Sequence, residues 1–64
     1  MNLRIAFQAE IDRGGRTRVL DVVAYGARSD KGDVRIALLE WLPGIELSEA
    51  ELAHLKNSAT RRAA

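Results

Sequence analysis

Three closely spaced arginines are the residues of this chain best suited to bind an anion. Arg13, Arg16 and Arg18 surround the pair Gly14 and Gly15, and guanidinium groups are common phosphate contacts in nucleic-acid-binding proteins. These three side chains are therefore candidate nucleic-acid contacts. We favour the alternative, ordinary solvated arginines at a hairpin tip, because the chain has ten basic and nine acidic residues and a net charge of only +1, whereas dedicated nucleic-acid binders are usually basic overall.

Few residues could carry catalysis or hold a metal ion. His54 is the only histidine and there is no cysteine, whereas zinc sites use several such ligands together. Ser48 is followed at the third position by Glu51, the spacing of a helix capping box, so its hydroxyl is expected to cap a helix rather than to attack a substrate. We therefore expect no enzymatic activity, no cofactor and no metal.

The length of the chain sets narrow bounds on its organisation. Its 64 residues suffice for one small domain over residues 1–64, and domains of this size bury too little surface to be more than marginally stable. Small folds are often reinforced by disulfides, by a metal or by oligomerisation, and with no cysteine and one histidine only oligomerisation remains. The sequence thus favours a homodimer.

The expected location is the cytoplasm. The N-terminal residues alternate between apolar and polar side chains, unlike a signal peptide. The longest apolar run, Ile36 to Leu39, is far too short to span a bilayer. The abundance of Arg and Ala is typical of a GC-rich bacterial or phage genome.

A β-hairpin is the clearest structural element of the sequence. Apolar residues occupy every odd position from Leu3 to Ile11, a period typical of a strand, and adjacent glycines suit a two-residue turn. The predicted strands are 2–12 and 17–26. Centring the turn on Gly14 and Gly15 pairs Phe7 with Val22, so that the apolar faces of both strands coincide.

A third strand and a helix complete the predicted fold. Asp30-Lys31-Gly32 suits a tight turn into a strand at 33–42, which Pro43-Gly44 ends. The capping box predicts a helix over 49–61, with a frayed tail at 62–64. The fold class is therefore α+β, a three-stranded antiparallel meander of order 1-2-3 with a C-terminal helix on one face (β-β-β-α). This layout is similar to three-stranded sheet-plus-helix DNA-binding modules such as integrase arm-binding domains, without a shared motif.

One helix can cover only one face of the sheet, and the predicted register leaves apolar residues on the other. Simple alternation places five candidate interface residues there: Val19, Val23, Tyr25, Leu39 and Trp41. An exposed cluster of this kind usually contacts a partner. The alternative is a β-bulge at Leu38-Leu39, which turns Leu39 and Trp41 toward the helix and Glu40 away from it.

These features favour a small non-enzymatic protein that acts through protein contacts, as an accessory or regulatory factor. We expect it to self-associate as a homodimer, either by stacking the uncovered faces or by pairing the long first strand edge to edge; any further protein partner is unknown. In the opposing interpretation, the charges of Arg4 and Glu10 keep that edge monomeric. The second functional hypothesis is a nucleic-acid-binding accessory protein that uses the arginines of the first hairpin.

Overall fold

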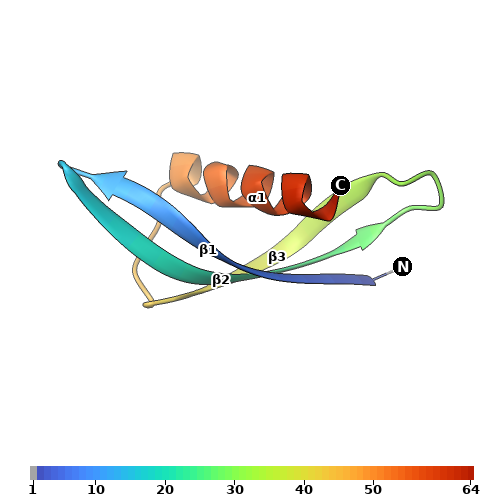
Figure 1. Ribbon diagram of the computed structural model, residues 1–64, viewed down its shortest axis with the longest axis horizontal. Helices are drawn as coiled ribbons and strands as arrows, with labels where there is room; N and C mark the ends of the chain where they lie inside the picture. The colour runs from blue at the N-terminus through green and yellow to red at the C-terminus, as the bar shows by residue number, and fades with distance from the viewer. Residues whose placement is uncertain (1) are drawn as a thin grey trace.

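The computed structural model describes residues 2–64 and shows three antiparallel strands followed by one helix. The strands are β1 (Asn2–Arg13), β2 (Arg16–Arg28) and β3 (Val34–Leu42), in the order β1-β2-β3, and the helix is α1 (Glu49–Ala63). The helix lies along one face of the twisted sheet (Figure 1). This arrangement confirms the predicted β-β-β-α fold. The molecule is elongated, with extents of 41 × 16 × 16 Å.

The predicted register of the first hairpin is confirmed. Phe7 pairs with Val22, and the pair Arg13 and Arg16 closes the turn. Gly14 and Gly15 have φ angles of 56° and 80°, which a two-residue primed turn requires and which other residues rarely adopt. The turn therefore sends the odd residues of β1 and the even residues of β2 to the same face.

The core lies between this face and the helix. Its fully buried side chains come from β2 and α1, with Leu20 and Leu55 both at 0% exposure. The buried apolar residues are Ala9, Ile11, Leu20, Val22, Ala24, Ile36, Leu55, Ala59 and Ala63. The helix contributes mainly alanines to this core, so it can approach the sheet closely.

A bulge in β3 corrects one prediction. Tyr25 pairs with Leu38 whereas Gly26 pairs with Ile36, so Ala37 has no partner on β2. Because of this extra residue, each side chain after it in β3 points to the face of the sheet opposite to the one that simple alternation assigns. The bulge lies one residue before the position that the sequence alternative named.

The expected placement of Leu39 and Trp41 on the uncovered face is therefore wrong. Both side chains are partly buried and pack against the core under the helix. The physical reason is Glu40, because unbroken alternation would direct its carboxylate toward the apolar core, where an unpaired charge is costly. With the bulge, Glu40 is exposed and apolar side chains take the inward positions.

The helix begins where the sequence predicts and extends past its predicted end. The Ser48 hydroxyl accepts from the Glu51 amide (3.1 Å), and the Glu51 carboxylate accepts from the Ser48 amide (2.8 Å), which confirms the capping box. Residues 62–64 were expected to fray, but α1 continues to Ala63, which is buried. Two contacts hold this end: Arg28 donates to the carbonyl of Ala63, and the Arg62 guanidinium lies 4.7 Å from the centre of the Phe7 ring. Within residues 2–64, no helix is long and apolar enough to cross a membrane.

Candidate interaction surface

The face of the sheet opposite the helix, here called the open face, is the candidate functional surface. Alternation along the strands assigns to it the even residues of β1, the odd residues of β2 and, after the bulge, the even residues of β3. Its central residues are Arg4, Ala6, Gln8, Glu10, Val19, Asp21, Val23, Tyr25, Leu38, Glu40 and Leu42.

The open face carries all the large apolar side chains that are strongly exposed in the described part of the chain. These are Val19 at 52%, Leu38 at 54% and Leu42 at 68% exposure. Val23 and Tyr25 lie beside them on β2 and are partly buried. Three of the five predicted interface residues, Val19, Val23 and Tyr25, thus lie on this face.

Leu38 and Leu42 are the open-face residues that the sequence prediction missed. Both follow the bulge, so they occupy the positions that simple alternation assigns to Leu39 and Trp41. The signal that identifies them is Glu40, which lies between them at a spacing of two residues, so all three share one face of the strand. A glutamate is expected on the solvent side, which favours placing Leu38 and Leu42 on the open face as well.

Charges on the open face are separated along its length. Glu10, Asp12 and Asp21 lie toward the end that carries the first hairpin turn, and Glu40 lies beside Val23 near the middle. Arg4 and Arg35 lie toward the opposite end. Gln8 donates to the Asp21 carboxylate over 3.2 Å. A shallow hollow on this face is lined by Asp21, Val23, Glu40 and Leu42 together with Trp41. The open face thus intersperses apolar and charged side chains, with its acidic groups toward the first hairpin turn and the middle and its arginines toward the opposite end.

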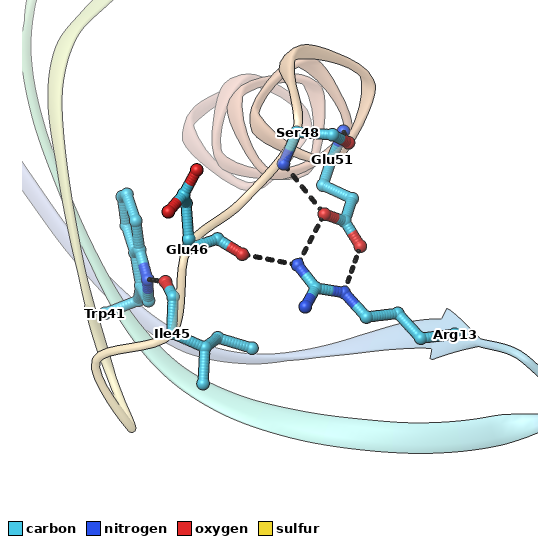
Figure 2. A network of polar contacts seen from close by, with 6 residues as sticks. All are labelled: Arg13, Trp41, Ile45, Glu46, Ser48 and Glu51. Carbon is cyan, nitrogen blue, oxygen red and sulfur yellow. Dashed lines mark hydrogen bonds and ion pairs between the residues drawn. The ribbon is translucent and has the colours of Figure 1, made fainter.

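The arginines of the first hairpin do not form a free basic cluster. The Arg13 guanidinium donates two hydrogen bonds to Glu51, at 2.7 and 2.8 Å, and a third to the Glu46 carbonyl (Figure 2). Arg16 and Arg18 are exposed, and alternation places them on the same side of the sheet as the helix, away from the open face. The structure therefore engages one of the three candidate nucleic-acid contacts within the fold.

The ion pair between Arg13 and Glu51 shifts the pKa of both groups. The pKa of Glu51 falls from 4.5 to about 2, first because Arg13 donates to its carboxylate and second because the Ser48 amide does so. The same hydrogen bond raises the pKa of Arg13. The side chains are 41% and 19% exposed, so solvent screens the pair. Its clear role is to join the tip of β1 to the first turn of α1.

A second contact of the same region fixes the loop that leads into the helix. The Trp41 indole N–H donates to the Ile45 carbonyl over 2.8 Å (Figure 2). Trp41 also borders an apolar groove between β3 and α1, whose other lining residues include Leu39, Leu52 and Lys56. The only tryptophan is thus part of the packing between strand, loop and helix.

Residues that could carry catalysis lie apart from the open face. His54 is exposed on α1, and the Ser48 hydroxyl is engaged by the helix cap. Within residues 2–64, no three His, Cys, Asp or Glu side chains lie close enough together to hold a metal ion.

Comparisons with protein-family models, with curated proteins and with solved structures find no match to this chain.

Proposed function

We propose that this protein is a non-enzymatic protein-interaction module that self-associates, with the open face as a protein contact surface. The observation that carries this proposal is that Val19, Leu38 and Leu42, the large apolar side chains of residues 2–64 that are more than half exposed, all lie on one face of the sheet. Scattered exposed apolar residues are ordinary, but here Val23 and Tyr25 lie between them on the same face, and apolar side chains that share one face of a small domain often mark an interface.

The composition of the open face supports a protein partner. Tyr25 lies beside Leu38 on β3, and Val23 is the next residue of β2 on the same face, with Arg4 and Glu40 next to them. Aromatic and apolar side chains are enriched in protein interfaces, and charged groups beside them add specificity. The same face carries four carboxylates, Glu10, Asp12, Asp21 and Glu40, against two arginines, Arg4 and Arg35. This balance is unfavourable for binding a polyanion such as a nucleic acid.

The size of the protein supports self-association in particular. Nine small-to-medium apolar residues form the buried core of residues 2–64, and no disulfide reinforces it. Burying the open face against a second copy adds apolar contacts that a single copy cannot make. Association with a partner that binds only the folded form also stabilises that form by mass action.

The test is sedimentation equilibrium of the wild type and of a Leu38→Ser/Leu42→Ser variant over a concentration series up to millimolar. The wild type is expected to show a weight-average mass above that of one chain, rising with concentration. The variant should show a lower mass at each concentration, whereas Ala50→Ser, an exposed position on α1, should match the wild type. A wild type that stays monomeric throughout contradicts the proposal, and so does a variant that associates as strongly as the wild type.

A further inference from the structure

We infer that the free edge of β1 pairs antiparallel with β1 of a second copy, with Phe7 on the two-fold axis and Arg4 opposite Glu10 of the second copy. The inference rests on the self-association named in the proposed function and adds a second contact to it. Edge pairing through β1 forms a dimer and leaves both open faces free, so Leu38→Ser/Leu42→Ser tests stacking of the open faces and the β1 variants test the edge. The product is a continuous six-stranded sheet with both helices on one side and both open faces on the other.

The first support is the state of the two sheet edges. β1 is a free edge of 12 residues that contains no proline and no bulge. The other edge, β3, is shorter, carries the bulge at Ala37 and ends just before Pro43. Bulges, short length and proline are the usual devices that protect an edge strand from pairing. Only the β3 edge has them.

The second support is the direction of the backbone groups of β1. Arg13 and Arg16 flank the two-residue turn, and such a flanking pair exchanges hydrogen bonds in this type of hairpin. Because hydrogen-bonded pairs alternate in an antiparallel ladder, the odd residues of β1 bond to β2. The even residues, from Asn2 to Asp12, direct their amide and carbonyl groups to the free edge.

The third support is charge complementarity on the open face of β1. A two-fold axis at Phe7 pairs residues whose numbers add to 14, so Arg4 lies opposite Glu10 of the second copy and Ala6 lies opposite Gln8. By symmetry the ion pair occurs twice. Opposite charges at directly facing positions stabilise an antiparallel pair, whereas like charges destabilise it. The two charges that could have protected this edge are thus placed to attract a second copy.

The helix side of the same edge is also complementary. Leu3, Ile5 and Phe7 are only partly buried in the single chain. In the inferred register they lie opposite apolar residues, Leu3 opposite Ile11, Ile5 opposite Ala9 and Phe7 opposite itself. Every helix-side position from 3 to 11 then meets an apolar partner.

The neighbouring registers are less favourable. Moving the axis to Gln8 pairs residues whose numbers add to 16, so even residues still bond to even residues. This register places Leu3 opposite Arg13. That arginine is held by Glu51 and the Glu46 carbonyl. The same shift puts Ala6 opposite Glu10 and brings Arg4 against Asp12, which accepts from the Thr17 hydroxyl. Moving the axis the other way, to Ala6, places Arg4 opposite Gln8 and forms no ion pair between the two strands. The axis at Phe7 is therefore better than either neighbouring register.

Charge exchange tests both the edge and the register. Arg4→Glu and Glu10→Arg should each raise the dimer dissociation constant about tenfold or more, because each creates two like-charge pairs. The double variant Arg4→Glu/Glu10→Arg should return to within about threefold of the wild type, since the pairs are restored with their signs exchanged. Arg4→Glu/Asp12→Arg is the matched control and should stay weak. Far-UV circular dichroism and Trp41 fluorescence confirm that each variant is folded.

A backbone variant tests the edge without changing charge. Ala6→Pro removes an amide that points to the free edge, so it should abolish pairing while the β1–β2 ladder persists. If the charge variants leave the dissociation constant unchanged while Leu38→Ser/Leu42→Ser lowers the mass, edge pairing is wrong and the proposed function stands. Recovery by Arg4→Glu/Asp12→Arg instead overturns the register. A monomeric wild type overturns the proposed function itself and this inference with it.

Discussion

Arg13 and Glu51 form a two-bond ion pair that links positions 38 residues apart in the chain, from the end of β1 to the first turn of α1. Glu51 uses the same carboxylate to accept from the Ser48 amide. One side chain thus completes the helix cap and fastens the helix to the hairpin. The stability of both elements depends on its ionisation.

Acid should weaken the fold through Glu51. Its pKa in the folded state, about 2, lies below the ordinary value of 4.5, so its contribution is fully present above about pH 4.5 and is lost as the pH falls toward 2. Chemical denaturation at a series of pH values should show the free energy of unfolding decreasing across this window. Glu51→Gln should reduce that decrease, and an equal pH dependence in the two proteins would contradict the assignment.

The hydrogen bond of Trp41 should contribute measurably to stability. Trp41→Phe removes the donor to the Ile45 carbonyl, and losing such a bond costs about 1 kcal/mol, with lost packing adding to it. Urea denaturation followed by circular dichroism measures the change. Tyr25→Phe, which removes a hydroxyl on the open face, is the control and should lie within about 0.5 kcal/mol of the wild type.

Gly26 should tolerate no side chain. A Cβ atom built there lies 2.1 Å from the Arg35 carbonyl oxygen and 2.9 Å from the Ile36 Cα atom, so the backbone at the bulge must move. Gly26→Ala should lower the free energy of unfolding by about 2 kcal/mol or more. Gly44→Ala is the matched control, because its Cβ meets nothing within 4 Å. Equal stabilities of the two variants would show that β3 is not packed this closely against β2.

Leu55 should be the most sensitive position of the helix. It is fully buried, and truncating such a side chain typically costs about 2–5 kcal/mol. Leu55→Ala should therefore unfold at a clearly lower urea concentration than the wild type. Leu42→Ala, at an exposed position, should change the stability by less than about 0.5 kcal/mol when measured at low protein concentration.

The parts of the fold that the sequence predicts correctly depend on local signals. The glycine pair and the odd-numbered apolar residues of β1 lead to one register, and Ser48 with Glu51 identifies the start of the helix. Each of these signals lies within a few residues and has one favourable solution. That is why the hairpin, its apolar face and the helix cap agree with the structure.

The bulge and the Arg13 contacts required information that no local pattern contains. With or without the bulge, β3 directs apolar residues toward the helix. Whether the bulge forms depends on the cost of burying Glu40 and on the close approach of Gly26 to Arg35. The pairing of Arg13 with Glu51 depends on where α1 lies over the sheet. The sequence shows the charge of Arg13 and its hairpin position, and both are equally consistent with a phosphate contact.

The helix of this protein is fastened at both ends by arginines of the first hairpin, Arg13 near its start and Arg28 at the carbonyl of Ala63. Lifting either end of α1 from the sheet breaks one of these contacts, while the buried Leu55 keeps the middle of the helix packed against the sheet. We therefore expect α1 to exchange its amide hydrogens only when the whole molecule opens, rather than as a separate unit of lower stability. A domain of this size then behaves as one cooperative body, which lets it present a rigid sheet to whatever binds it.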